Sequence, residues 1–149
     1  MQVMQLQTEW NNHQVFDFGV WLKSIYSYIE DVALKNFAHR VPKAEIGVCF
    51  TCWPNTRAYA QEALLAVVDF AFNMLSLNKV YLRSTLFNKL YGKLAEDCGF
   101  VQEGILRSDY CGADSDELLY LIYYAMTRMD FEQMKQRKAE TQATAVAKQ

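Results

Sequence analysis

The sequence lacks the features that mark several large classes of protein. None of its 149 residues falls in a run of about 18 apolar residues, the length that a membrane-spanning helix needs. The first 14 residues are polar and do not show the charged and then apolar order of a secretion signal. The 17 acidic and 15 basic residues nearly balance, so the chain has no overall attraction for nucleic acid or anionic membranes. We therefore expect neither partner, and a cytoplasmic location.

The four cysteines lack the spacing of a metal site. Cys49 and Cys52 form a C-x-x-C pair, but Cys98 and Cys111 stand far apart, whereas a zinc site needs a second close pair. A thioredoxin-like redox pair would open a helix, and this pair ends an apolar, strand-like run. Two reduced strand cysteines are the favoured interpretation, with a metal or redox role as the alternative. We predict no metal.

The chain has enough apolar residues for a single domain with a sizeable core. Hydrophobic residues make up 52% and aromatic residues 14% of its length, which excludes disorder for most of it. We divide it into a polar segment at 1–14, a folded domain at 15–131 and a polar tail at 132–149. The tail has no apolar stripe, so we expect a frayed helix or a disordered end there.

The hydrophobic pattern predicts an α/β fold with a mixed sheet. The expected order is strand, strand, strand, helix, strand, helix, strand, strand, over residues 15–23, 28–37, 44–50, 57–76, 77–83, 90–98, 100–106 and 118–126. Short joins predict that the first three strands form an antiparallel meander. The helix at 57–76 is apolar almost all round, which indicates that it is covered on most sides. A strand, a helix and a strand imply a parallel crossover, and Gly99 is suited to end the second helix.

Seven short motifs occur in a characteristic order. They are Ala44-Glu45-Ile46-Gly47, Tyr59-Ala60-Gln61-Glu62-Ala63-Leu64, Leu77-Asn78-Lys79-Val80-Tyr81-Leu82-Arg83, Asn88, Glu96-Asp97-Cys98-Gly99-Phe100, Glu103-Gly104-Ile105-Leu106-Arg107 and Gly112-x-x-x-Asp116-x-x-x-Tyr120. Through this series the chain, over about residues 16–129, resembles the GNAT family of N-acetyltransferases. It looks closest to the branch that contains ribosomal-protein N-terminal acetyltransferases and spermidine acetyltransferases. The resemblance implies a mixed sheet splayed open between the strand at 44–50 and the strand at 80–83.

The resemblance also implies acetyl-CoA as the cofactor, lying in that V-shaped gap. Its pantetheine arm would pair with the strand ending near Cys49–Trp53, as an added strand does. Its pyrophosphate would sit at the start of the helix near Arg57, where free backbone N–H groups and the helix dipole favour an anion. The cofactor-binding residues so implied are Phe50, Cys52, Asn55, Thr56, Arg57, Ala58, Tyr59, Ala60 and Asn88.

The implied reaction is attack of a primary amine, on a small molecule or a protein N-terminus, on the acetyl thioester. It needs a path for the amine proton, a donor to the oxyanion and an acid for the leaving thiolate. Tyr91, three residues after Asn88, is the candidate acid, and an aromatic packed between helix and sheet is the alternative. Glu45 is the candidate base or water anchor, with a hydrogen-bonded strand carboxylate as the alternative. Ala95 occupies the position at which spermidine acetyltransferases carry their tyrosine acid.

The pyrophosphate loop departs from the family pattern Gln/Arg-x-x-Gly-x-Gly/Ala. The aligned run is residues 55–60, in which Ala58 replaces the glycine and Thr56 replaces the usual additional glycine. Glycine lets the backbone approach phosphate oxygens closely, so we expect weakened cofactor binding, with Arg57 as a compensating charge.

The segment before the first predicted strand is short. The family begins with a strand and two helices that form one wall of the acceptor site, and only residues 1–14 precede the strand at 15–23. We therefore expect a fold lacking most of the first strand and the first two helices, with a homodimer covering the open sheet edge. A non-catalytic or degenerate acetyltransferase-like module for binding or assembly is the alternative function.

Overall fold

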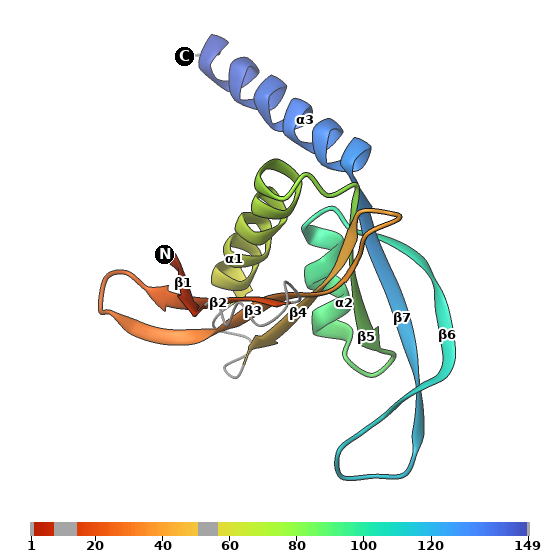
Figure 1. Ribbon diagram of the computed structural model, residues 1–149. Helices are drawn as coiled ribbons and strands as arrows, with labels where there is room; N and C mark the ends of the chain where they lie inside the picture. The colour runs from red at the N-terminus through yellow and green to blue at the C-terminus, as the bar shows by residue number, and fades with distance from the viewer. Residues whose placement is uncertain (1, 8–14, 51–56, 149) are drawn as a thin grey trace.

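The computed structural model describes residues 2–7, 15–50 and 57–148. In chain order its elements are β1 (Gln2–Gln7), β2 (Val15–Leu22), β3 (Ser27–Ala38), β4 (Lys43–Phe50), α1 (Arg57–Asp69), the π-helical turn η1 (Phe70–Met74), β5 (Lys79–Thr85), α2 (Lys89–Asp97), β6 (Val101–Cys111), β7 (Leu118–Thr127) and α3 (Arg128–Ala147). The strands form one mixed sheet in the order β1-β2-β3-β4-β5-β7-β6. Helices α1 and α2 lie over one face of this sheet (Figure 1). The predicted α/β class with a mixed sheet is confirmed.

The centre of the sheet contains a parallel pair that separates after a short distance. β2, β3 and β4 form the expected antiparallel meander, and β4 then pairs with β5 in parallel. This parallel ladder holds three residue pairs, Lys43 with Lys79, Ala44 with Val80 and Glu45 with Tyr81. Beyond Glu45, β4 continues to Phe50 and β5 continues to Thr85 without pairing to each other. The predicted opening between the two strands is therefore present.

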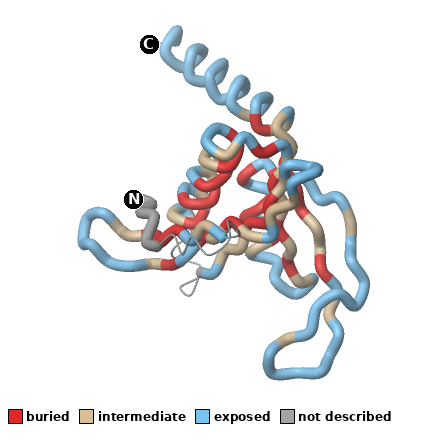
Figure 2. The backbone as a smooth tube through the Cα atoms, viewed as in Figure 1, coloured by how far each residue is buried: buried red, intermediate tan, exposed pale blue. Residues whose placement is uncertain are grey.

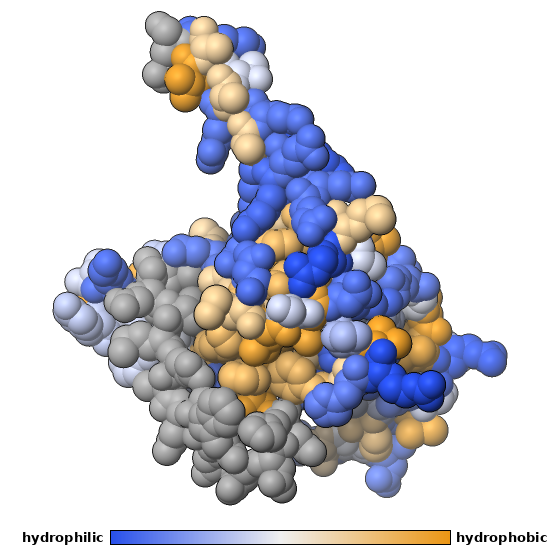
Figure 3. All heavy atoms as spheres, turned by 45° about the horizontal axis from the view of Figure 1, so that its top comes forward, coloured by the Kyte–Doolittle hydropathy of each residue, from blue (hydrophilic) through white to orange (hydrophobic). Residues whose placement is uncertain are grey.

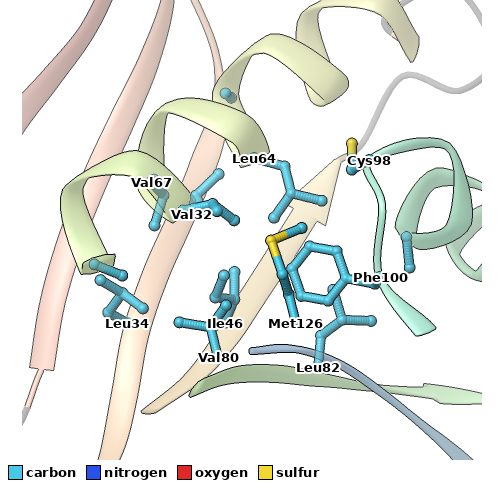
Figure 4. Packing of buried hydrophobic residues seen from close by; sticks show 14 of the residues in the cluster. Val32, Leu34, Ile46, Leu64, Val67, Val80, Leu82, Cys98, Phe100 and Met126 are labelled. Atoms are coloured by element: carbon cyan, nitrogen blue, oxygen red, sulfur yellow. The ribbon is translucent and has the colours of Figure 1, made fainter. Parts of the chain in front are cut away.

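The hydrophobic core lies between the sheet and the two helices α1 and α2. Residues that alternate along the central strands, among them Leu34, Ile46 and Leu82, point toward α1, whose Leu64 and Val67 meet them (Figure 4). Burial concentrates in this layer and falls away toward the β6–β7 hairpin and α3 (Figure 2). The residues between these core positions therefore point to the opposite face of the sheet, which α1 and α2 leave uncovered.

Helix α1 is enclosed on most sides, as its composition predicts. Ala60, Leu64 and Val68 are buried, and the exposed residues are Ala58, Glu62 and Ala66, which are spaced four apart and form one narrow stripe. The prediction of a helix covered on most sides is confirmed.

Two further elements differ from the sequence prediction at the ends of the chain. β1 pairs antiparallel with β2, for example Val3 with Val20, so a strand exists where only a polar segment was expected. The expected loss of most of the first strand is therefore wrong: six residues, three of them apolar, hold that edge of the sheet through backbone hydrogen bonds.

The polar tail forms most of a 20-residue helix, α3, and is neither frayed nor irregular over its described length. A capping box starts it, in which the Thr127 hydroxyl accepts from the Asp130 backbone N–H and the Asp130 carboxylate accepts from the Thr127 N–H. Phe131 anchors the first turn by stacking on Phe72 of η1, with ring centroids 4.8 Å apart. The rest of α3 leads away from the body and is mostly hydrophilic (Figure 3). Among the described residues, none of the helices is long and apolar enough to cross a membrane.

Helix α2 ends just before Gly99, as the sequence predicts, and a substitution at this glycine tests its role. Gly99 has a φ of +92° and donates from its N–H to the Glu96 carbonyl, while the Phe100 N–H reaches the Ala95 carbonyl. A Cβ at Gly99 would also lie 3.1 Å from the Met134 sulfur. Gly99→Ala should lower the free energy of unfolding by about 1–2 kcal/mol, measured by urea denaturation.

Gly112→Ala is the matched control, because a Cβ there meets open space and its φ is not positive. That variant should stay within about 0.5 kcal/mol of the native chain. Equal losses in the free energy of unfolding for the two variants would show that the end of α2 does not depend on the left-handed backbone of Gly99.

Candidate active site

A cleft of about 370 Å³ occupies the place where β4 and β5 separate. It exists because the ladder between the two strands ends at Glu45 and Tyr81. β3, β4, β5, α2 and the β6–β7 hairpin all contribute to its lining, which includes Glu45, Val48, Arg83, Asn88, Tyr91 and Tyr110. Both predicted catalytic residues, Glu45 and Tyr91, therefore line one cleft, together with the predicted cofactor-binding residue Asn88.

Glu45 is held at the base of this cleft by two neighbouring strands. Its side chain is 7% exposed, and the Arg83 guanidinium on β5 donates to it twice, from Nε to Oε1 at 3.0 Å and from Nη2 to Oε2 at 3.1 Å. The Asn36 amide on β3 adds a third hydrogen bond to Oε2, at 2.7 Å. A buried carboxylate needs such donors to offset the loss of water. Glu45, in the last β4–β5 residue pair, is thus joined to Arg83, two residues beyond that pair on β5.

A bulge in β3 brings Asn36 to Glu45. Asn36 has a φ of +54°, a left-handed conformation that asparagine tolerates better than most residues, and the β3–β4 register shifts between Lys35 and Ala38. The sequence analysis missed both Asn36 and Arg83. Arg83 does end one of the seven motifs, but only the strand register shows that it meets Glu45.

Tyr91 is positioned by the start of α2. The Asn88 side chain caps this helix by accepting from the Tyr91 backbone N–H at 3.1 Å, which places Tyr91 one turn into α2 with its side chain at the cleft. Burial raises the pKa of the Tyr91 phenol, and the Val48 backbone partly opposes that shift. The phenol therefore keeps its proton near neutral pH, as an acid must.

The predicted cofactor-binding residues fall into two groups. Cys52, Asn55 and Thr56 lie outside the described residues, as does the Phe50 side chain, so their roles stay predictions. The run Arg57, Ala58, Tyr59 and Ala60 forms the first turn of α1, with Ala60 buried and Ala58 exposed.

Arg57 differs from the expectation of a free phosphate donor. It does not line the cleft, and its guanidinium pairs with Asp97 at the end of α2. Lys93 also pairs with Asp97, and the two cations lower the pKa of that carboxyl. Arg57 therefore ties α1 to α2 in this conformation.

The cysteines show no common site in the described part of the chain. Cys49 is exposed and free, and the Glu30 carboxyl beside it raises the pKa of its thiol. Cys98 is buried, which raises the pKa of its thiol to about 12. Cys52 lies outside the described residues, and within them no group of three or more metal-ligating side chains comes together.

Comparison with known proteins shows which family and which relatives this chain resembles. A family model described as an acetyltransferase (GNAT) domain matches residues 2–101. Spermidine N(1)-acetyltransferase of Vibrio cholerae is 28% identical over 88 residues, which are 59% of this chain and 49% of that protein. The chain thus spans about half the length of the curated relative that it matches.

Solved structures from Vibrio cholerae share this fold. Spermidine N-acetyltransferase in complex with CoA and spermine is 21% identical, with a TM-score of 0.72 over 81% of this chain and 70% of that one. Spermidine/spermine N-acetyltransferase in complex with manganese ions is 20% identical, with a TM-score of 0.73 over 83% of this chain and 71% of that one.

The Glu45–Arg83 bridge should contribute measurably to stability. Arg83→Met leaves a buried carboxylate with one of its two partners, which should lower the free energy of unfolding by about 2 kcal/mol, since the guanidinium is partly exposed. Glu45→Gln should cost less in the Arg83→Met background than in the native chain. Urea denaturation of the two single variants and the double variant measures this coupling.

Arg107→Met, on the edge strand β6, is the control for the loss of an exposed arginine, and it should change stability by less than about 0.5 kcal/mol. Strict additivity of the Arg83 and Glu45 substitutions would mean that the bridge contributes nothing.

Proposed function

We propose acetyl transfer from acetyl-CoA to a primary amine as the function of this chain, which belongs to the GNAT acetyltransferase family. The observation that carries the proposal is the separation of β4 from β5 after three residue pairs, with a cleft in the gap. Two adjacent parallel strands normally pair along their shared length, so an opening here must be maintained by other contacts. The cleft contains a protonated phenol and a fixed carboxylate, which are groups that amine acylation uses.

The residues present fit the cofactor. From Ile46 to Phe50 the edge of β4 that faces β5 has no strand partner, so its backbone groups, apart from the one at Val48 that contacts the Tyr91 phenol, are available to the amides of a pantetheine arm. The first turn of α1, at Arg57–Ala60, follows this strand and offers N–H groups to a pyrophosphate. The relative crystallised with CoA and spermine supports the same ligand class. When bound, acetyl-CoA supplies the activated acetyl thioester.

Two side chains then have distinct roles. Tyr91 donates its phenolic proton to the departing thiolate, since burial raises the pKa of the phenol and leaves it protonated at neutral pH. Glu45 has both oxygens engaged by Arg83 and Asn36, so it serves as the anchor of a proton path and of the strand separation. The amine proton leaves toward solvent along this polar side of the cleft.

A small-molecule amine is the acceptor class that the relatives support, and a protein N-terminus is the other class that the reaction accommodates. A homodimer accompanies this proposal, because β6 is an edge strand exposed along its length. The cytoplasm is the compartment we propose.

A non-catalytic binding module is the second candidate function. Ala58 stands where the family pattern has glycine, and Arg57 pairs with Asp97 and does not line the cleft. Both observations argue for weaker binding of the cofactor pyrophosphate. Cofactor binding is therefore the property that distinguishes an acetyltransferase from a non-catalytic module.

Thermal unfolding measures that property. Acetyl-CoA at 100 times its dissociation constant should stabilise the fold by about 2.7 kcal/mol, which raises the melting temperature by roughly 5–10 °C for a domain of this size. ATP at the same concentration controls for binding of any anionic nucleotide. No shift with millimolar acetyl-CoA would favour the non-catalytic candidate.

Tyr91→Phe tests the proposed acid. It should lower kcat by about 10²-fold or more while leaving acetyl-CoA affinity nearly unchanged, because only the proton donor is removed. Because the phenol's pKa is raised, the loss should be uniform between about pH 7 and 9, and no basic limb should arise from this group. Steady-state rates across that range, with calorimetric binding of acetyl-CoA, provide the measurement.

Tyr124→Phe is the matched control, because Tyr124 is a buried tyrosine that does not line the cleft. Its kcat should match that of the native chain. A Tyr91→Phe enzyme with native kcat would remove the hydroxyl from the chemistry and leave Tyr91 as a packing residue.

A further inference from the structure

Lys35 is a cleft residue to which neither the reaction nor the core assigns a role. It lies on β3, opposite Glu45 in the β3–β4 register, and it lines the cleft. Its side chain crosses Gly47 of β4: a Cβ at Gly47 would be 3.4 Å from both Cε and Nζ of Lys35. The absence of a side chain at Gly47 therefore gives the lysine its path toward the gap between β4 and β5.

Lys35 has no acidic partner among the described residues. Both oxygens of its cross-strand neighbour Glu45 are engaged by Arg83 and Asn36. Arg83 also faces a second carboxylate, with Nη1 3.7 Å from Asp109 Oδ2. Arg83 thus faces two carboxylates, whereas the Lys35 ammonium forms an ion pair with neither of them. An unmatched ammonium beside a half-enclosed cleft attracts an anion and repels another cation.

The Lys35 ammonium and the proposed position of the cofactor phosphates lie on opposite faces of the sheet. Ile46, between Glu45 and Gly47, points into the core under α1. Glu45, Gly47 and Lys35 therefore lie on the opposite face, which α1 and α2 do not cover. The first turn of α1, where the pyrophosphate is proposed to sit, belongs to the helix side. A ligand that meets Lys35 approaches the gap from the other side.

We propose that Lys35 binds an anionic group of the acceptor, in the simplest case a carboxylate, so that the preferred acceptor is an amine that also carries a carboxylate. This inference rests on the proposed acetyl transfer. A charge-assisted hydrogen bond from the ammonium selects such a molecule. A polyamine brings a second ammonium to the same place, where Lys35 repels it. Lys35 is then a residue that sets the acceptor preference of this chain.

Three acceptors of equal chain length test the proposal. Aminohexanoate, hexylamine and hexanediamine share one reacting amine and differ at the far end, which is a carboxylate, a methyl group or an ammonium. With acetyl-CoA as donor, kcat/KM should be about tenfold higher for aminohexanoate than for hexylamine, and lowest for hexanediamine. The preference should shrink as salt concentration rises.

Variants of Lys35 connect that preference to one side chain. Lys35→Met should reduce the advantage of aminohexanoate about tenfold, Lys35→Arg should keep it, and Lys35→Glu should shift the preference to hexanediamine. The acetyl-CoA dissociation constant should be the same in all of them. Lys23→Met, in the exposed turn between β2 and β3, removes the same charge away from the cleft and should change nothing.

Calorimetric titration of the three amines into the protein with coenzyme A separates this proposal from acetyl transfer itself. Binding of aminohexanoate that depends on Lys35, without turnover of any amine, would support the lysine and contradict the enzymatic function. Turnover without a carboxylate preference, or with one that Lys35→Met leaves intact, would overturn the lysine's role and leave acetyl transfer standing. Failure of all three amines to bind, or a Lys35→Met effect confined to acetyl-CoA affinity, would likewise overturn it.

Discussion

The structure depends on the interruption of one parallel strand pair. β4 and β5 are bound at their first three residue pairs and apart beyond them. Unpaired strand edges inside a sheet are costly unless something satisfies their backbone groups. The opening is tolerable because the cleft exposes those groups to solvent or to a ligand with amides of its own. Every candidate role in this protein, from Tyr91 to Lys35, refers to that gap.

The Glu45–Arg83 bridge lies at the point where the paired part of β4 and β5 ends and the gap begins. It runs from Glu45, in the last β4–β5 residue pair, to Arg83, two residues beyond that pair, and Asn36 adds a contact from β3. Hydrophobic packing below the bridge, through Ile46 and Leu82, keeps the strands attached to α1. The charged bridge on one face and the apolar core on the other together set where the strands separate. Because Arg83 and Asn36 already bind both oxygens of Glu45, this carboxylate does not pair with Lys35.

The fold is shared with the spermidine/spermine N-acetyltransferase structure at 20% identity over 83% of the chain. The acceptor preference that we propose for this chain therefore rests on the side chains around the gap and not on the backbone. A half-buried lysine over a glycine, in a cleft whose carboxylate is already paired, suits an acceptor of opposite charge to a polyamine.

Local patterns in the sequence were sufficient for most of the fold: the alternation at 28–37 and 44–50, the helix after residue 57 and the glycine that ends α2. They failed for β1, a six-residue strand that pairs with β2 through its backbone, and for α3, whose polar sequence has little hydrophobic periodicity and which begins at a capping box. For the site, motif order brought Glu45, Asn88 and Tyr91 to one place. Only the tertiary structure shows that Arg83 and Asn36 donate hydrogen bonds to the Glu45 carboxylate and that Lys35 forms no ion pair with it. These contacts depend on the strand register and on the bulge in β3, which the residue types do not encode.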